Sequence, residues 1–267
     1  MTDTSFPADW QIPAHDTVVL AERRHDHVLV IPVINEGERI RGQLRRVAEA
    51  KLPVDVVVAD GGSTDGSLDL DFLRSVGVRA LLTKTGPGKL SAQLRMAYGW
   101  CLAQGYAGIV TIDGNGKDGV DAVRTMVEKL EAGFDYVQGS RYAPGGIAEN
   151  TPLERTIANR GIHAPLLSLA AGKRYSDTTN GFRAYSSRYL LDPRVAPFRD
   201  VFMRYELLFY LTTRANQLKY RSCEIGVVRR YPAGEPTPTK ISGSGAKLDV
   251  LKQTFNAALG RYKPDAR

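Results

Sequence analysis

Short apolar segments alternate with helix-forming segments through the first half of this chain. Each apolar segment is hydrophobic along nearly its whole length, which is typical of a strand that is covered on both faces of a sheet. Alternation of such strands with helices is typical of a parallel sheet, because parallel strands need a crossover, usually helical, to join them. The sequence therefore predicts an α/β fold with a mostly parallel sheet flanked by helices. The predicted strands are 27–33, 54–59, 78–83, 108–112 and 136–139, and the predicted helices are 36–50, 68–75, 89–103 and 120–132.

The composition divides the chain into three regions within one integrated domain. Residues 1–26 are polar, contain prolines and show weak periodicity, so we expect an irregular N-terminal arm. Residues 27–145 carry the alternating pattern, and residues 146–267 form a more irregular half. The Pro- and Gly-rich stretch 231–245 is typical of a mobile binding loop. In the second half, the predicted helices are 153–171, 204–213 and a basic one at 246–259, and the predicted strand is 224–228.

The net charge of +7 suits an anionic partner. No helix-turn-helix, zinc-finger or RNA-binding signature accompanies the charge, so phosphorylated substrates or lipid headgroups fit better than nucleic acid. No run approaches the roughly 20 apolar residues that span a bilayer, and residues 1–16 lack the apolar core of a signal peptide. We therefore expect a cytoplasmic protein, at most peripheral on the inner face of the plasma membrane. Cys101 and Cys223 lie far apart and are expected to be reduced.

The segment V-T-I-D-G-N-G-K-D at 110–118 carries the strongest chemical signal. A buried strand runs into a turn that contains Asp113, Asn115 and Lys117, and open α/β sheets bind ligands at the carboxyl ends of their strands. Two oxygen ligands one residue apart can hold a divalent cation against a diphosphate, and an ammonium group can neutralise the diphosphate directly. This turn predicts nucleoside-diphosphate chemistry, although a plain metal site would prefer Asp at position 115 and no Lys at 117.

Two earlier strands also end in polar residues. The first ends in I-P-V-I-N-E, which places Pro32, Asn35 and Glu36 at its carboxyl end, and the second ends in V-V-A-D-G-G-S-T-D-G, with Asp60 at its tip. A carboxylate there can accept the imide N–H of uracil or the edge donors of guanine, but it can equally form the turn or cap a helix. No G-x-G-x-x-G follows the first strand, so these ends are not the dinucleotide fingerprint.

Taken in order, these motifs resemble glycosyltransferase family 2, the inverting enzymes of the GT-A (nucleotide-diphospho-sugar transferase) fold with its Rossmann-like sheet. The resemblance covers 28–252 and is closest to the dolichol-phosphate mannosyltransferase-like, polyprenyl-phosphate branch. It implies transfer of a sugar, with inversion, from a UDP- or GDP-linked donor to a polyprenyl phosphate. The segments that carry it are P-V-I-N-E, V-A-D-G-G-S-T-D-G, G-P-G-K-L-S-A-Q, T-I-D-G-N-G-K-D, V-Q-G-S-R-Y and T-T-N-G-F-R-A-Y.

The resemblance also implies roles for the residues that match its motifs. Glu206 lies where the family often has a carboxylate under the sugar, and Lys240 resembles the lysine of a mobile loop that closes over phosphate. Lys89 would lie near the nucleotide, although a lysine at a helix start needs no such role. The implied nucleotide-sugar-binding residues are Pro32, Asn35, Glu36, Asp60, Lys89, Asp113, Gly114, Asn115 and Lys117; the implied acceptor- or phosphate-binding residues are Arg141, Asn180, Arg183 and Lys240; and the catalytic candidates are Asp113, Arg141, Asp177 and Glu206.

Family members usually carry Asp at the position of Asn115, and often Gln or His at that of Lys117. Asn115 could still offer an amide oxygen, so the resemblance implies Mg²⁺ or Mn²⁺ held by Asp113 and Asn115. Lys117 would repel a metal and could take over part of its function. The resemblance therefore implies that activity depends on a metal, whereas Asn115 and Lys117 argue against this dependence.

The acceptor decides whether the reaction needs a general base. A lipid phosphate is already an anion, whereas a sugar hydroxyl must give a proton to a carboxylate, for which Asp177 and Glu206 are candidates. Asp177 could instead be a structural partner of Arg183. The apolar part of the predicted helix 153–171 could lie on a membrane surface or pack into the core.

Three other functions remain open from the sequence. A glycosyltransferase that extends a saccharide of a cell-surface glycan or glycolipid would need a working base. A nucleotidyltransferase would carry a Gly-rich, basic loop near the first strand, where this chain has P-V-I-N-E. A non-catalytic nucleotide-sugar-binding module would bind its ligand without turnover.

Overall fold

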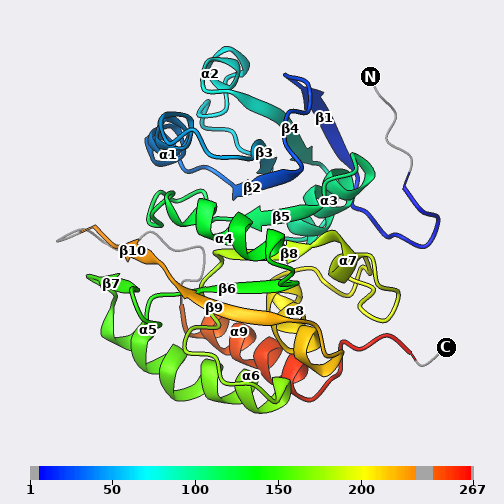
Figure 1. The fold of residues 1–267 in the computed structure, drawn as a ribbon, viewed down its shortest axis with the longest axis vertical. Helices are drawn as coiled ribbons and strands as arrows, with labels where there is room; N and C mark the ends of the chain where they lie inside the picture. The colour runs from blue at the N-terminus through cyan, green and yellow to red at the C-terminus, as the bar shows by residue number, and fades with distance from the viewer. Residues whose placement is uncertain (1–5, 233–242, 266–267) are drawn as a thin grey trace.

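The computed structural model describes residues 6–232 and 243–265. In this part of the chain, the centre is an eight-stranded sheet with the order β1-β4-β3-β2-β5-β8-β6-β9 (Figure 1). Strands β2 to β5 pair in parallel, as do β6 and β9, whereas β1 and β8 run antiparallel to their neighbours. Helices lie on both faces of the sheet, so the predicted α/β architecture is confirmed.

The elements of the first half follow the predicted order. Its strands are β1 (His15–Val19), β2 (His27–Val33), β3 (Asp55–Asp60), β4 (Val78–Lys84), β5 (Gly108–Thr111) and β6 (Tyr136–Ser140). Its helices are α1 (Glu38–Glu49), α2 (Leu70–Ser75), α3 (Leu90–Ala103) and α4 (Ala122–Glu131).

The second half contains more helix and shorter strands. Its strands are β7 (Ile147–Glu149), β8 (Arg183–Ser186), β9 (Ser222–Gly226) and β10 (Val228–Arg230). Its helices are α5 (Leu153–Ala158), a π-helical turn (Asn159–His163), α6 (Ala164–Ala171), α7 (Ser187–Leu190), α8 (Glu206–Gln217) and α9 (Gly243–Ala258).

The central strands are apolar along their length because each strand feeds two cores. In β2, Val28 and Val30 belong to the core beneath α3 and α8, whereas Leu29, Ile31 and Val33 belong to the opposite core beneath α1 and α4. Successive side chains of a strand point to opposite faces. Burial on both faces fixes the register of these strands, and with it the position of their carboxyl ends.

The expectation of a wholly irregular arm at 1–26 was wrong. Within it, β1 pairs antiparallel with β4 at the edge of the sheet, His15 opposite Lys84 and Val19 opposite Ala80. An edge strand has a partner on one side and solvent on the other, so it needs no continuous apolar run that a sequence would reveal. The short strand β8 was also missed.

The predicted strand 224–228 is divided into two strands that go different ways. β9 continues the large sheet beside β6, whereas β10 leaves it and pairs in parallel with β7. This departure carries β10 across the carboxyl end of β5. The predicted helix 153–171 forms α5, the π-helical turn and α6 in succession.

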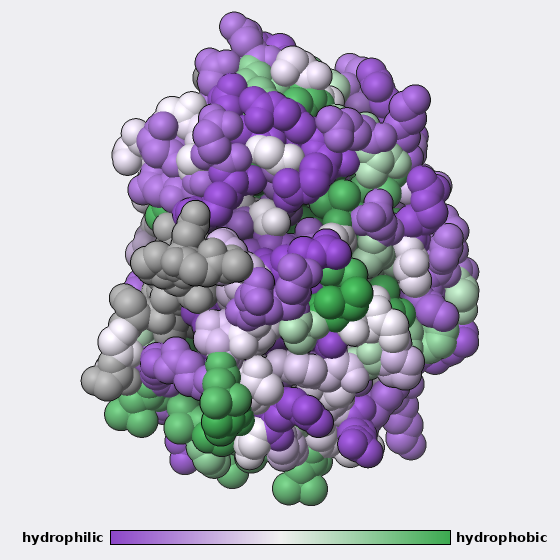
Figure 2. Space-filling model, turned by 90° about the vertical axis from the view of Figure 1, so that its left-hand side faces the viewer, coloured by the Kyte–Doolittle hydropathy of each residue, from purple (hydrophilic) through white to green (hydrophobic). Residues whose placement is uncertain are grey.

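Apolar side chains reach the surface at the lower end of the molecule (Figure 2), where Figure 1 places α5, α6 and α9. The sequence left open whether the apolar part of the predicted helix 153–171 packs into the core. Leu167 does so and is buried, whereas Leu169 is 83% exposed. Among the described helices, none is both long and apolar enough to cross a membrane. We call the exposed side chains here the apolar end face; they are Leu153, Ile157 and Leu169 with Leu248 of α9 and Leu259 directly after it.

Candidate functional site

The predicted site residues of the first half meet at one edge of the sheet. β2 lies between β3 and β5 in parallel register, so Pro32, Asp60 and Asp113 stand at neighbouring strand ends. The backbone N–H of Gly114 donates to the Pro32 carbonyl at 3.1 Å. The Gln43 side chain, fully buried on α1, donates to the Asp113 carbonyl at 3.0 Å and accepts from the Gly116 N–H at 2.8 Å. The turn after β5 is therefore held from two sides.

Asp60 and Asn35 connect the loops that follow β3 and β2. Both oxygens of Asp60 accept hydrogen bonds from Ser63, whose hydroxyl lies 2.6 Å from Oδ1. Asn35 adopts a left-handed conformation, with φ of 49°, and its side chain accepts from the Thr64 N–H at 2.8 Å. Asp60 therefore forms the turn, as one reading of the sequence allowed, and its contact with a base stays a prediction. An open hollow of about 390 Å³ borders it, lined by Asp60, Ser63, Asp65, Gly66, Leu68, Asp69, Leu81 and Thr83.

Glu36 and Lys89 flank this edge. The Glu36 carboxylate pairs with Arg39 at 2.9 Å. Lys89 is exposed at the start of α3, and its N–H donates to the Met203 carbonyl at 2.6 Å. Their predicted contacts with the nucleotide stay predictions.

A residue that sequence reasoning did not place, Arg229 of β10, lies beside Asp113. Its Nη2 donates to Asp113 Oδ2 at 2.9 Å, and its Nη1 donates to Asp118 Oδ2. Burial disfavours a charged guanidinium, but Asp118 and Asp113 outweigh this effect and hold the pKa of Arg229 well above its ordinary value. The backbone of Gly181 also lies against the Asp113 carboxylate. It is so close that a Cβ at position 181 would overlap Oδ1 of Asp113.

Four cationic side chains surround the ring of Tyr231. The Lys117 ammonium lies 4.9 Å from the ring centroid, and Arg155 and Arg229 each lie 5.7 Å from it. Nη1 of Arg141 donates to the tyrosine hydroxyl at 3.5 Å. Burial raises the pKa of Tyr231, but the charges of Arg229 and Arg141 outweigh it and lower that pKa below its ordinary value. We call these four residues and Tyr231 the cationic cluster.

The ammonium of Lys117 is itself buried, because the residue is only 5% exposed. Burial and the charge of Arg229 lower its pKa, so the cluster holds this cation against a desolvation cost. Positive charge concentrated in a place with little water attracts an anion strongly, because the low local dielectric screens it weakly. The site is therefore built to receive negative charge beside Asp113.

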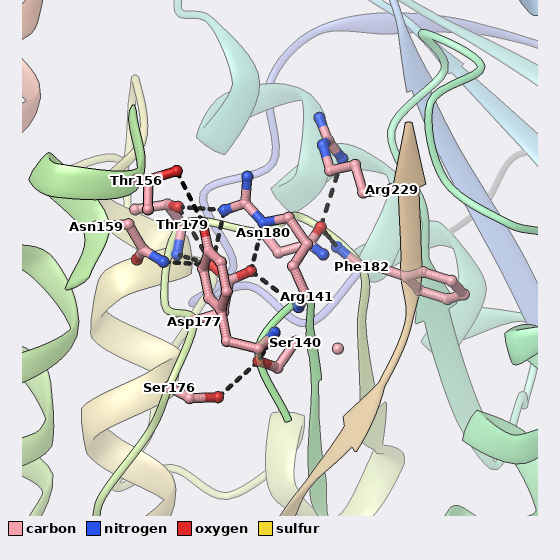
Figure 3. Close-up of polar contacts among 12 residues, drawn as sticks. Ser140, Arg141, Thr156, Asn159, Ser176, Asp177, Thr179, Asn180, Phe182 and Arg229 are labelled. Atoms are coloured by element: carbon pink, nitrogen blue, oxygen red, sulfur yellow. Dashed lines mark hydrogen bonds and ion pairs between the residues drawn. The ribbon is translucent and has the colours of Figure 1, made fainter. Parts of the chain in front are cut away.

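The structure pairs Asp177, one of the two predicted general bases, with Arg141, which opposes that role. It is completely buried, and its Oδ2 accepts from Arg141 Nε at 2.7 Å while Oδ1 accepts from Arg141 Nη2 at 2.9 Å and from Asn159 at 3.0 Å (Figure 3). Burial opposes its ionisation, but hydrogen bonds from Arg141 and its charge outweigh burial and lower the pKa of Asp177. A carboxylate so engaged cannot take a substrate proton. It is a structural partner, of Arg141 rather than of Arg183.

Arg183 is likewise paired in the interior. Its side chain is fully buried and donates to the backbone carbonyls of Thr178, Asn180 and Leu208. These bonds join the start of β8 to the loop before it and to α8. Asn180 is nearer the site: its Oδ1 accepts from the Phe182 N–H at 3.1 Å and from Arg229 at 3.4 Å (Figure 3). The burial of Arg183 opposes its predicted acceptor contact, and the acceptor contacts of both Arg183 and Asn180 stay predictions.

Glu206 is mostly buried at the start of α8, where its Oε2 accepts from the Arg204 N–H at 2.5 Å. This bond holds the backbone just before α8. The predicted role of Glu206 under the sugar stays a prediction. Lys240 lies outside the described residues, as does most of the predicted mobile loop.

The residues present do not fit the expected Mg²⁺ or Mn²⁺. Asp113 already pairs through Oδ2 with Arg229, and the amide oxygen of Asn115 accepts from the Lys117 N–H at 3.3 Å. Divalent cations of this kind take about six oxygen ligands, with carboxylates as the strong ones. Here the Arg229 guanidinium already pairs with both Asp113 and Asp118, and the Lys117 ammonium lies near the same Tyr231 ring. Among the described residues, no group of three or more His, Cys, Asp or Glu side chains could hold a metal ion.

Arg229 and Tyr231 were missed because the sequence shows their charge and ring but not their burial. The signal available was R-R-Y directly after a strand that ends at the carboxyl edge. In a strand, alternate residues point to opposite sides, so only one of the two arginines could point inward. The structure turns Arg229 inward and leaves Arg230 exposed, paired with Glu149 at 2.7 Å.

Solved structures with this arrangement define the class of fold. Glucosyl-3-phosphoglycerate synthase from Mycobacterium tuberculosis, in complex with Mn²⁺, uridine diphosphate and phosphoglyceric acid, superposes with a TM-score of 0.61, covering 90% of this chain and 80% of that one. The identity is 17%, so this similarity shows the fold alone. It is the GT-A fold that the sequence motifs predicted.

The sequence comparison gives the family. The model of glycosyl transferase family 2 matches residues 28–192, more than half of the chain, which therefore belongs to this family. The chain is 30% identical over 166 residues to polyprenol monophosphomannose synthase of Mycolicibacterium smegmatis, covering 61% of this chain and 62% of that protein. It is 33% identical over 162 residues to undecaprenyl-phosphate mannosyltransferase of Micrococcus luteus, covering 58% and 64%. The matched part thus spans less than two thirds of the length of these relatives.

The structural role of Asp177 can be tested by unfolding. Asp177→Ala leaves the Arg141 guanidinium buried without its partner, so the free energy of unfolding in urea is expected to fall by about 3–5 kcal/mol. The matched control is Asp71→Ala, because Asp71 pairs with Arg74 on the exposed surface; its expected loss is below about 1 kcal/mol. An Asp177→Ala protein of unchanged stability would contradict the assignment.

Proposed function

We propose that this chain transfers a sugar from a nucleoside-diphosphate sugar to a polyprenyl phosphate, with inversion at the anomeric carbon. The family supports glycosyl transfer, and the names of both relatives above state a polyprenyl or undecaprenyl phosphate product or acceptor. The same names favour a mannosyl donor. The binding edge at Asp60 and Asp113 is where this proposal places the nucleotide.

The observation that carries the choice of acceptor is the engagement of both predicted bases. Asp177 is locked to Arg141, and Glu206 is bonded to the start of its helix. A saccharide hydroxyl must lose a proton as it attacks, whereas a phosphate monoester is already an anion near neutral pH. Among the described residues, the four cations of the cluster exceed the three carboxylates that pair with them, Asp113, Asp118 and Asp177, and this positive excess suits an anionic acceptor and an anionic leaving group. This supports a lipid phosphate over a saccharide hydroxyl.

The proposed reaction is a single displacement. A phosphate oxygen of the acceptor forms a bond to the anomeric carbon while the bond from that carbon to the oxygen of the donor diphosphate breaks. The bonding electron pair leaves with the nucleoside diphosphate, and nothing is oxidised or reduced. Negative charge grows on the leaving diphosphate, so fixed positive groups of the cationic cluster lower the barrier. Asp177 and Thr179 hold Arg141 in one orientation for this purpose.

The apolar end face supports an acceptor that lies in a membrane. Leu153 and Ile157 stand one turn apart on α5. Leu248 stands on α9 and Leu259 directly follows it, and an ion pair between Lys247 and Glu154 joins α9 to α5. Apolar side chains flanked by basic ones are typical of surfaces that lie in the interface of a bilayer. Exposed basic residues around this face are Arg160, Arg174, Lys252, Arg261 and Lys263. We propose that this face rests on an anionic membrane.

Release of nucleoside diphosphate tests the proposed reaction. With a panel of UDP- and GDP-sugars, we expect release that depends on added polyprenyl phosphate and a sugar-linked lipid as the product. Asp113→Ala should reduce release by about 10- to 100-fold, because this carboxylate is proposed to accept a hydrogen bond from the ribose of the donor. Asp121→Ala is the control, because Asp121 is exposed and caps nothing with its side chain. Release stimulated by a saccharide instead, or binding without release, would contradict the lipid acceptor.

Vesicle binding tests the membrane face. We expect the chain to sediment with vesicles that contain phosphatidylglycerol, and Leu153→Glu with Leu259→Glu to weaken binding by about 100-fold, since each leucine contributes roughly 1.5 kcal/mol on burial. Leu191→Glu is the matched control, because Leu191 is also exposed but lies after α7. Equal loss in the control would contradict a specific face.

A further inference from the structure

We propose that Lys117 and Arg229 hold the diphosphate of the donor directly, in place of a divalent cation. This inference rests on the proposed function, because it specifies how the same site binds a nucleoside-diphosphate sugar. The side chains around Asp113 do not suit the expected metal, because Arg229 already pairs with Asp113 and the amide oxygen of Asn115 accepts the Lys117 N–H.

The first step is the charge that a metal would meet. Asp113 faces the Arg229 guanidinium at 2.9 Å, and the Lys117 ammonium lies 4.9 Å from the centroid of the Tyr231 ring, which Arg229 approaches at 5.7 Å. A dication bound to Oδ2 of Asp113 would compete with Arg229 for that oxygen and would face two cations with little water to screen them. The amide of Asn115 brings no negative charge to offset this repulsion.

The second step is that the two cations are fixed relative to each other by backbone bonds. The Arg230 N–H donates to the Lys117 carbonyl at 2.8 Å, and the Gly119 N–H donates to the Val228 carbonyl at 2.9 Å. Between these bonds, Asp118 and Arg229 form an antiparallel bridge. The turn after β5 and β10 are thus joined along three residues. Such preorganised positive groups stabilise charge without reorganisation, as a bound metal does.

The third step is that Arg229 can take a phosphate without becoming unpaired. Nη1 stays with Asp118, which is completely buried behind it, and Nε donates to the Tyr231 hydroxyl at 3.4 Å. Nη2 faces Asp113, the more exposed of the two carboxylates, with 26% of its side chain accessible. A diphosphate oxygen can replace Asp113 at Nη2, since guanidinium groups bind phosphate through their planar set of donors.

Lys117 complements this arrangement. An ammonium is a compact charge with three donors, suited to a diphosphate that offers several oxygens. It follows Asp113 by four residues in the turn that binds the donor in this proposal, and Tyr231 holds its position. Together the two side chains supply two positive charges, the same charge as one divalent cation.

Nucleotide binding to the full chain tests this proposal separately from catalysis. Titration calorimetry measures the Kd of UDP and GDP, in EDTA and in excess Mn²⁺. We expect one of the two to bind with the same Kd in both conditions. Lys117→Gln and Arg229→Met should each weaken binding by about tenfold or more, the value of a charge-assisted hydrogen bond. Arg230→Met is the matched control, because Arg230 is its exposed neighbour on β10, and its Kd should not change.

Arg229→Met leaves Asp118 buried without its partner and can fail to fold. In that case Lys117→Gln decides the question alone, with its folding checked by circular dichroism. Binding that EDTA abolishes and Mn²⁺ restores would overturn this inference and leave the proposed function intact. An unchanged Kd in Lys117→Gln would also overturn it. Absence of UDP and GDP binding in both conditions would overturn the inference and the proposed function together.

Discussion

Arg229 pairs with two carboxylates, one buried in the interior and one partly exposed at the site. The arrangement of the site depends on these two ion pairs. Asp118 holds one end of the guanidinium in the interior, and Asp113 meets the other end where the donor is proposed to bind. Removing a buried partner from such a pair costs far more than an exposed ion pair contributes. The contact therefore fixes β10 over the turn after β5, and it sets the charge that a ligand meets there.

The same logic extends to the rest of the cluster. Asp177 keeps Arg141 charged and oriented in the interior, and Tyr231 offers its ring and hydroxyl to the surrounding cations. Each buried cation thus has a partner that compensates part of its desolvation. The cluster as a whole remains able to attract an anion, which connects its electrostatics with a reaction whose leaving group is a diphosphate.

Much of the fold could be predicted from the sequence, because the central strands are apolar on both faces and their helices show a clear periodicity. The edge strand β1 and the short strand β8 could not, since neither carries a continuous apolar run and both depend on pairing with distant segments. At the site, the turn with Asp113 and Lys117 was readable from one stretch of sequence. The burial of Arg229 was not, because it arises from a strand that crosses from the other half of the chain.

The assignments that changed share one physical cause. Asp177 and Arg183 are charged residues in segments that resemble a binding motif, and a charged residue in sequence carries no sign of whether it faces a ligand or a buried partner. Asp177 proved to face Arg141, and Arg183 proved to face backbone carbonyls. Asn115 and Lys117, in contrast, departed from the family pattern in the sequence itself, and the structure places Arg229 beside the same turn.

The most direct test of this account is the anomalous scattering of Mn²⁺ in crystals of the chain grown with a nucleoside diphosphate and excess Mn²⁺. We expect a diphosphate in contact with Lys117 and Arg229 and no anomalous peak between the diphosphate and Asp113. A Mn²⁺ peak bonded to Asp113 and the diphosphate, with Arg229 turned away, would contradict it.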